Sequence, residues 1–422
     1  MKKQYTIFFL LFSLQMFAQD LVIETFSEAH HSGANTITQT FNFPEDVSNF
    51  EKIEMRISLT CPTGGCDPWD RIAWLQLHTT NNTFEIGRYA TPYGNDWCSW
   101  LIDVSDYRLL LNGEVTLSSY IETWDKGWLV DVDFEFYEGA PEYEYIRIEN
   151  LWTGNETDPS LTNNNDYYNF LYGEPFFNYN LPSKAITIPS NREKSMVRIV
   201  NTGHGQANTH NAAEFSDKTH ELKINNLTVA NHHLWNSDCN LNPCSPQSGT
   251  WQYARAGWCP GQNIIPKDID ITSNTYIWQE LELDYVLEDY VNECTPWNMN
   301  CIDGITCTDC SFNGGSHTQP NYKIAIQLFH FSNEFMAVNE NVTSPISIYP
   351  NPADDVLNVR FPDSNQSFRI ECYNLQGQLV FNRIIMNSNT VDLSINNINN
   401  GVYTLKFVSE TKTYTHKLIL SH

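Results

Sequence analysis

The segment from Cys61 to Arg71 carries the side chains in this sequence that are best suited to chemistry. Cys61 and Cys66 are close enough along the chain to form a disulfide that closes a small ring in an oxidising compartment. Trp69, Asp70 and Arg71 follow this ring. An indole face can stack on a sugar ring, and a carboxylate beside a guanidinium can hold or deprotonate a water molecule. The alternative is a stapled turn whose Asp70 and Arg71 form a surface ion pair.

A second carboxylate lies beside aromatic residues at the end of a predicted strand, Glu114–Ile121. The odd positions of this strand are mostly apolar and form one face, so Tyr120, Glu122 and Trp124 point to the opposite face. This places a carboxylate next to two aromatic rings on a face away from the core. A solvated outer face with incidental aromatic residues is the alternative.

Two later segments carry the same residue types. Glu214 lies among small residues after His210, and Arg255 precedes Trp258 by three positions. All but six of the 50 acidic residues precede Ser347, so carboxylates meet by chance in this part of the chain and their number identifies no site. A surface position is therefore the alternative for Glu214.

The elements that must position these side chains are predicted to be β-strands. Short runs rich in aromatic and β-branched residues, separated by turn residues, recur from Thr36 to Phe331 and again after Ser347. They predict an all-β fold of two adjacent eight-stranded antiparallel jelly rolls plus a small C-terminal β-sandwich. The predicted parts are a signal peptide (1–18), two jelly rolls (19–155 and 156–335), a linker (336–345) and the C-terminal domain (346–422).

The start of the chain and its charge bound the classes of function. Lys2 and Lys3 precede an apolar run, Thr6–Phe17, and then Ala18, which is typical of a secretory signal peptide. No later segment is apolar for long enough to span a bilayer, so we expect an exported protein without a membrane span. The net charge of −26 argues against nucleic acid as a partner, because phosphate binding needs a basic patch.

The eleven cysteines fit an exported protein. The group Cys294, Cys301, Cys307 and Cys310 has a spacing compatible with a zinc site, but two disulfides are expected in that compartment. Cys372 is alone in its domain, so it is expected to be a buried free thiol.

Taken in order, these segments resemble the peptide-N-glycosidase F family, which are secreted bacterial amidases that remove N-linked glycans from asparagine. The resemblance covers nearly all of residues 20–335, and Cys-x4-Cys-Asp-x-Trp-Asp-Arg is its most specific element. The residues that carry it are Cys61–Arg71, Phe84–Tyr89 with Thr91–Tyr93, Ile102–Asp106, Glu122–Trp124, Val130–Phe134, Glu214, Ile224–Asn226 and Arg255–Gly261. It implies two jelly rolls with the site between them, no metal or cofactor, and N-linked glycoproteins or glycopeptides as partners. A monomer is expected.

The resemblance also assigns roles to single residues. Asp70 matches the principal catalytic carboxylate of the family, Glu214 the second, and Glu122 a third that holds the first GlcNAc. The matching substrate-binding residues are Trp69, Arg71, Trp124, Arg255 and Trp258. The matching disulfides are Cys61–Cys66 and Cys239–Cys259. The implied reaction is hydrolysis of the amide bond between the asparagine side chain and the first GlcNAc, which converts asparagine to aspartate.

The chain departs from the family pattern in three places. Ala212 and Ser216 stand where the family brackets its second glutamate with two cysteines. The segment before Glu214 is shorter than its counterpart, so no role for His204 carries over. Residues 294–310, together with Cys98 and Cys244, have no counterpart, which leaves the pairing of these cysteines open.

The C-terminal part resembles another family. Ile346–Ala353 (Ile-Ser-Ile-Tyr-Pro-Asn-Pro-Ala), Leu375–Leu379 and Gly401–Leu405 are similar to the sorting domain of type IX secretion. The resemblance implies export by the signal peptide and then by the type IX secretion machinery, to the cell surface or the medium, and no part in chemistry.

Two other functions deserve comparison. Copper monooxygenases of the peptide-amidating kind also have paired jelly rolls, but they need histidine pairs and a methionine ligand. The adjacent pairs His30–His31 and His232–His233 would project to opposite faces of a strand, without an obvious methionine nearby. A non-catalytic glycan-binding adhesin is the remaining alternative, although it has no need for Asp70, Glu122 and Glu214 together.

Overall fold

The computed structural model divides into two compact units, residues 1–337 and 338–422. The predicted signal peptide, most of the predicted linker and the predicted boundary between the jelly rolls lie outside the described residues. The structure describes residues 21–154, 167–173, 181–276, 280–295, 298–302, 305–307, 310, 318–334, 336, 346–361, 368–374, 378–385, 389–408 and 413–421.

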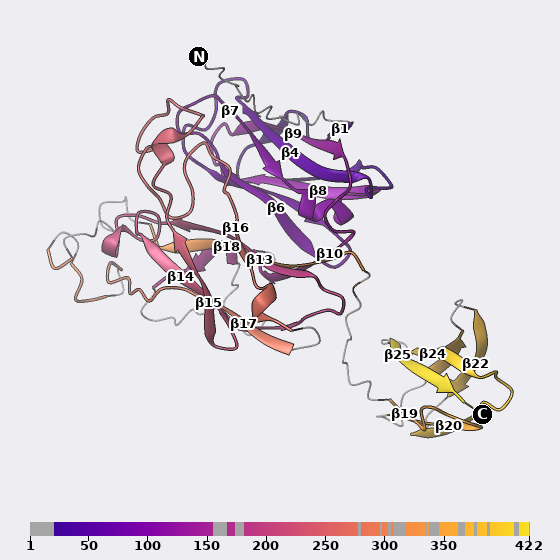
Figure 1. Ribbon diagram of the computed structural model, residues 1–422. Coiled ribbons are helices and arrows are strands. Elements are labelled where there is room, and N and C mark those ends of the chain that lie inside the picture. Colours follow the sequence, from indigo (N-terminus) through magenta and orange to yellow (C-terminus); the bar gives the residue numbers. More distant parts are fainter. Residues whose placement is uncertain are drawn as a thin grey trace, which may run out of the picture. The chain divides into compact units, whose positions relative to one another are not determined.

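The first half of the large unit is a pair of antiparallel sheets (Figure 1). One sheet has the order β1-β9-β4-β7, with β2 paired to β9, and the other has the order β3-β8-β5-β6. The strands are β1 (Leu21–Glu24), β2 (Ala29–His31), β3 (Thr36–Asn42), β4 (Phe50–Thr60), β5 (Ile72–His78), β6 (Thr83–Ala90), β7 (Trp97–Asp103), β8 (Glu114–Ile121) and β9 (Trp128–Glu138). Alternation in β4 buries every second residue from Ile53 to Leu59, because successive side chains point to opposite faces.

The second half of the large unit repeats this plan. One sheet has the order β10-β18-β13-β16, with β11 paired to β18, and the other has the order β12-β17-β14-β15. The strands are β10 (Tyr145–Trp152), β11 (Phe170–Leu171), β12 (Lys184–Thr187), β13 (Lys194–His204), β14 (Lys218–Ile224), β15 (Leu227–Leu234), β16 (Lys267–Asp270), β17 (Glu280–Val286) and β18 (Asn321–Ser332). The strand β10 lies in the segment that we assigned to the first jelly roll, yet it pairs with β18 over its whole length.

The predicted all-β fold is confirmed, and each continuous sheet path in the large unit has four strands, to which the short β2 and β11 are added. The odd positions of β8 from Val115 to Ile121 are buried, as the alternation predicts. No helix among the described residues is long and apolar enough to cross a membrane.

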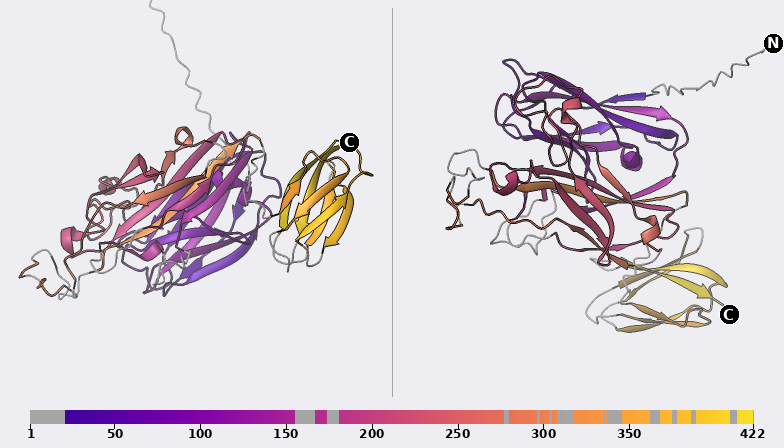
Figure 2. Two further views of the ribbon diagram at one scale, coloured as in Figure 1. Left: turned by 90° about the horizontal axis from the view of Figure 1, so that it is seen from below. Right: turned by 60° about the vertical axis from the view of Figure 1, so that its left-hand side comes forward.

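The two sheet pairs lie against each other (Figure 2), and hydrogen bonds along the seam between them join β18 of the second pair to β6 of the first. All but the first of the twelve residues of β18 are buried. Buried polar contacts cross the seam: Arg88 Nη1 donates to the carbonyl of Lys323 at 2.5 Å, and the Tyr107 hydroxyl donates to Gln327 Oε1 at 2.5 Å. Because these groups are buried and paired, they fix the register of the two jelly rolls.

The C-terminal unit is a small sandwich with its own apolar core. Its two sheets have the orders β19-β20-β23 and β22-β21-β24-β25. The strands are β19 (Ser347–Tyr349), β20 (Val356–Arg360), β21 (Phe368–Tyr373), β22 (Leu379–Ile385), β23 (Thr390–Ser394), β24 (Gly401–Val408) and β25 (Thr413–Leu420). Cys372 is buried on β21 as a free thiol, which confirms the prediction.

Candidate active site

Asp67 organises the turn that carries Asp70. Its side chain is fully buried and accepts three hydrogen bonds: from the Trp69 backbone N–H at 3.0 Å, from Arg71 Nε at 2.7 Å and from Thr123 Oγ1 at 2.6 Å. The Cys61–Cys66 disulfide precedes this turn, as predicted. Asp67 therefore ties the turn before β5 to the segment that follows β8.

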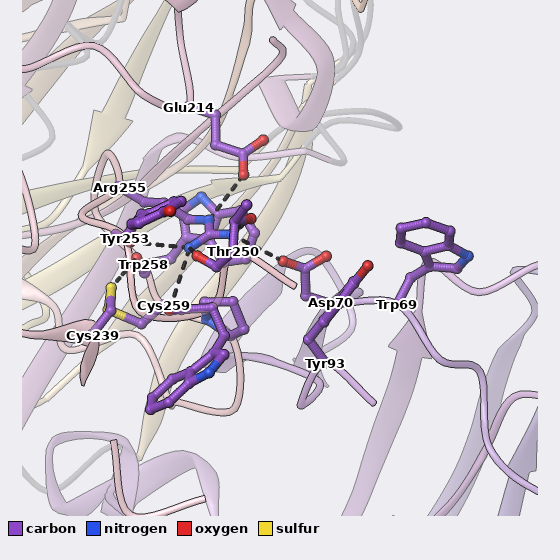
Figure 3. A network of polar contacts seen from close by, with 12 residues as sticks. Trp69, Asp70, Tyr93, Glu214, Cys239, Thr250, Tyr253, Arg255, Trp258 and Cys259 are labelled. Atoms are coloured by element: carbon purple, nitrogen blue, oxygen red, sulfur yellow. Dashed lines mark hydrogen bonds and ion pairs between the residues drawn. A yellow bond between two sulfur atoms is a disulfide. The ribbon is translucent and has the colours of Figure 1, made fainter. Parts of the chain in front are cut away.

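Asp70 points from this turn toward Arg255, which belongs to the second jelly roll (Figure 3). Its Oδ2 atom lies 3.5 Å from Arg255 Nη2. Burial raises the pKa of Asp70, while the Arg255 guanidinium is the largest influence in the opposite direction. The alternative interpretation, in which Asp70 and Arg71 form an ion pair at the surface, is not what the structure shows, since Arg71 pairs with Asp67.

Arg255 is buried, and its guanidinium group is saturated with acceptors. Nε donates to Glu214 Oε1 at 2.9 Å, and Nη2 donates to Thr250 Oγ1 at 3.0 Å and faces Asp70. Nη1 donates to the backbone carbonyls of Thr250 and Tyr253, each at 3.0 Å. The single guanidinium therefore bridges one carboxylate from each jelly roll (Figure 3).

Glu214 lies in a loop held by backbone hydrogen bonds. Its N–H donates to the carbonyl of Gly205 at 3.2 Å, and its carbonyl accepts from the N–H of Ala256 at 2.9 Å. Gly203 permits this close packing, because a Cβ atom there would lie 2.6 Å from the Ala213 carbonyl oxygen. These contacts hold the loop between Ala212 and Ser216, the positions at which the family pattern has two cysteines.

Burial raises the pKa of Glu214 to about 7; the Arg255 guanidinium opposes this rise and the negative charge of Asp70 adds to it. The two carboxylates therefore interact through the cation that they share. Near neutral pH, Glu214 is divided between its protonated and ionised forms, which allows it to donate a proton.

Glu122 lies apart from this trio but at the same junction of the two jelly rolls. Its Oε2 atom is 3.2 Å from Nζ of Lys323, a buried lysine on β18. The carboxylate is partly exposed, so its other oxygen can accept a hydrogen bond from a ligand. No sequence pattern predicted the Lys323 contact, since this lysine lies within a run of apolar strand residues.

The predicted aromatic residues divide into exposed and buried ones. Trp69 and Trp124 are 52% and 62% exposed, so their ring faces are accessible for stacking on a sugar. Trp69 packs edge-on against Tyr93, and the Arg71 guanidinium lies 4.9 Å from the Trp124 ring centre. Trp258 is only 4% exposed and packs against Arg255, so its indole holds the Arg255 side chain in place.

His204 is buried next to this support. Its ring centre lies 5.2 Å from that of Trp258, and its Nε2 atom is 2.9 Å from Thr202 Oγ1. Burial, followed by the nearby positive charges of Lys323, Arg88 and Arg255, lowers the pKa of His204 well below its usual value. The imidazole is therefore neutral at physiological pH.

The disulfides resolve the cysteine pairing. Cys239–Cys259 forms as the resemblance implied, and Cys98–Cys244 joins β7 to the loop that leads to Arg255. The cysteine-rich segment has the pairs Cys294–Cys310 and Cys301–Cys307, as expected for two disulfides. Sulfur atoms of Cys294, Cys301 and Cys310 lie within 4.8 Å of one another, but paired cysteines offer no thiolate to a metal.

Comparisons with known families agree with this geometry. Residues 172–301 match the family described as peptide-N-glycosidase F, C terminal, and residues 347–421 match the secretion system C-terminal sorting domain. Over 298 residues the chain is 32% identical to the peptide-N(4)-(N-acetyl-beta-D-glucosaminyl)asparagine amidase F of Elizabethkingia miricola, covering 65% of this chain and 79% of that protein.

Solved structures show the same likeness. The PNGase F of Flavobacterium meningosepticum, a glycosylasparaginase, has a TM-score of 0.62 and 27% identity, covering 75% of this chain and 97% of that one. A recombinant PNGase F has a TM-score of 0.62 and 28% identity, covering 74% of this chain and 96% of that one. With the matched relative and the paired jelly rolls taken together, the chain belongs to the peptide-N-glycosidase F family.

Proposed function

We propose that this protein is an amidase that hydrolyses the bond between an asparagine side chain and the first GlcNAc of an N-linked glycan. The observation that carries the proposal is the arrangement of Asp70 and Glu214, which come from different jelly rolls and meet at buried Arg255. The relative named an asparagine amidase supplies the bond and the substrate class. The alternative of a glycan-binding adhesin gives no reason for burying two carboxylates around one cation.

In the proposed reaction, Asp70 accepts a proton from a water molecule while the water oxygen attacks the amide carbonyl carbon. The carbon–nitrogen bond then breaks, and Glu214 gives its proton to the leaving nitrogen. The products are a peptide that carries aspartate and the glycan as a glycosylamine. Because Glu214 is partly protonated near neutral pH, it can supply the proton to the leaving nitrogen, and we assign the role of base to Asp70.

Arg71 is our candidate for stabilising the negative charge that develops on the carbonyl oxygen. It follows Asp70 directly, and buried Asp67 anchors it through Nε. Arg255 is saturated by Thr250, Tyr253 and the two carboxylates, so it acts as a positioning residue. A preorganised cation contributes strongly to such a step because it needs no reorganisation.

The sugar side of the site is proposed to lie beside Glu122 and the exposed indoles. Glu122 accepts a hydrogen bond from the first GlcNAc, while Trp69 and Trp124 offer faces for stacking. Trp258 supports Arg255 from behind. None of these steps needs a metal ion or a cofactor.

We further propose the route and the form of the protein. Residues 1–18 direct export and are removed, and the type IX secretion machinery recognises residues 346–422. The mature protein acts as a monomer on N-linked glycoproteins and glycopeptides outside the cell. The proposed limits of the two jelly rolls are residues 19–155 and 156–335, except that β10 (Tyr145–Trp152) pairs with β18 and so belongs to the second.

The first test is to incubate the protein with an N-glycosylated peptide and to weigh the peptide by mass spectrometry. Loss of the whole glycan, with the asparagine mass shifted to that of aspartate, is the expected result. A peptide that keeps one GlcNAc would mean cleavage between the two innermost sugars. Glycan retention on a sugar array without any hydrolysis would favour the adhesin.

Asp70→Asn is expected to lower kcat by at least about a hundredfold, since the amide cannot accept the proton from water. Asp106→Asn is the matched control, because Asp106 is also partly buried and pairs with an arginine, Arg198, at 2.8 Å. The rate of glycan release by both variants measures the effect. Full activity of Asp70→Asn would contradict the mechanism.

A further inference from the structure

We propose that Lys323 is a positioning residue that holds Glu122 in the orientation in which it binds the first GlcNAc. The inference rests on the proposed amidase function. Glu122 follows β8 in the first jelly roll, whereas Lys323 lies on β18 of the second, so the sugar contact depends on both halves of the molecule.

The Lys323 ammonium group is buried and has three oxygen atoms within 3.2 Å. It donates to the Tyr168 carbonyl at 3.1 Å and to Asn169 Oδ1 at 3.2 Å, and Glu122 Oε2 lies at 3.2 Å. A buried ammonium group is costly unless it is fully paired. Its position is therefore set by three partners and not by Glu122 alone.

The partners of Lys323 are themselves fixed. Its backbone carbonyl accepts a hydrogen bond from Arg88, whose guanidinium forms a buried ion pair with Glu85 at 2.8 Å. The Tyr168 hydroxyl donates to the same Glu85 carboxylate at 2.5 Å. The seam between the jelly rolls thus holds Lys323 rigid from both its backbone and its side chain.

This rigidity is transferred to Glu122. The Glu122 backbone is fixed by a hydrogen bond from its N–H to the Ile72 carbonyl at 3.0 Å. Its side chain has several rotatable bonds, and ordering them on sugar binding costs conformational entropy. With one oxygen held by Lys323, the carboxylate is ordered before the sugar arrives, and that cost is avoided.

The test separates binding from turnover. Lys323→Met is expected to raise KM for a glycopeptide by about tenfold, the size of a lost charge-assisted contact, with kcat changed much less. Lys323→Arg is expected to restore most of the affinity, since it keeps the positive charge. Lys223→Met is the control, because Lys223 also pairs with a glutamate, Glu221, at 2.9 Å, and it should leave KM unchanged.

A double-mutant cycle with Glu122→Gln identifies the route of the effect. If Lys323 acts through Glu122, Lys323→Met adds little to KM in the Glu122→Gln background. An equal rise in KM in both backgrounds, or no rise at all in a folded Lys323→Met variant, would overturn the inference. If Lys323→Met does not fold, Lys323→Gln, which keeps hydrogen-bond donors, replaces it in the cycle. Absence of hydrolysis by the unmodified protein would instead contradict the proposed function itself.

Discussion

Arg255 contacts two acidic side chains but carries only one positive charge. This excess of acidic groups determines how the site binds and releases protons. When both Asp70 and Glu214 are ionised, the trio carries a net negative charge in a buried place, which is unfavourable. Uptake of one proton removes that charge. The trio therefore behaves as a coupled unit that holds one exchangeable proton near neutral pH.

The pH dependence of kcat tests this coupling. Glu214 donates a proton in the proposed reaction, and its pKa is about 7, so kcat is expected to fall as pH rises above that value. Glu214→Gln keeps the hydrogen bond from Arg255 but cannot release a proton. It is expected to be at least about a hundredfold slower and to lack the alkaline fall.

Rates of glycan release across the neutral and alkaline range measure both effects. If kcat of Glu214→Gln still falls at alkaline pH, the group that titrates is a residue other than Glu214. A Glu214→Gln variant with normal rates would remove the proton donor from the mechanism.

At the residue scale, the sequence indicated which kinds of side chain form the site, but it gave less information about which of these side chains contact one another. The resemblance matched Asp70 and Glu214 to the first and second carboxylates of one site, and in the structure each of them contacts Arg255. Lys323 was not predicted, because its contact with Glu122 joins positions far apart in the chain. The burial of Trp258 could not be predicted either, since the sequence around a tryptophan near an arginine does not show whether the indole is exposed or buried.

At the element scale, the loop between β15 and β16 decides where Arg255 sits. The disulfide Cys98–Cys244 joins this loop to β7 of the first jelly roll. The Tyr93 N–H donates to Gln247 Oε1 at 2.7 Å, and Asn95 Nδ2 donates to the Cys244 carbonyl at 3.0 Å. The loop is thus attached to the jelly roll that carries Asp70.

Replacing both Cys98 and Cys244 by alanine is expected to lower the free energy of unfolding by about 3–5 kcal/mol, because this disulfide closes a long loop in the unfolded chain. The activity should fall as well, since the Arg255 loop loses its covalent attachment. Urea unfolding and glycan-release rates measure the two effects. The Cys301→Ala, Cys307→Ala pair is the control, because that disulfide spans only six positions and should cost less stability.

The positions of the strands along the chain were predicted more completely than the pairing of the strands within the sheets. Alternation identified Glu114–Ile121 as the strand β8, because the odd positions of this strand form a buried face. The edge strand β7 was not predicted, since its exposed face carries Trp97 and Leu101 and hides the alternation. The partner of β10 could not be read from sequence, because pairing with β18 is a long-range contact.

At the scale of the whole molecule, buried histidines link the stability of the large unit to pH. Burial lowers the pKa of His31 and His232 to about 4 and that of His220 and His330 to about 3. The unfolded chain binds protons at these groups below its ordinary histidine pKa, while the folded protein does not. Their contribution to stability is therefore present near neutral pH and is lost as the pH falls.

We expect the free energy of unfolding to decrease on acidification below about pH 6.5, with each such histidine contributing up to about 1.4 kcal/mol per pH unit. Urea unfolding at several pH values measures this slope. His330→Asn should reduce the dependence of the free energy of unfolding on pH by the contribution of one histidine, because the asparagine amide does not titrate. A stability that stays constant down to the range of carboxylate titration would contradict this account.

The two jelly rolls are fastened along their seam by buried contacts of Arg88, Tyr107 and Lys323 and by the Cys98–Cys244 disulfide. Such a seam resists the hinge motions by which many two-lobed enzymes close on their ligands. The conformational change that brings the amide bond to Asp70 is therefore expected to occur in the glycoprotein substrate and not in the enzyme. Asparagines in loosely held or unfolded stretches can swing their amide bond onto Asp70, whereas those set in stiff, well-packed surfaces will keep their glycans longer.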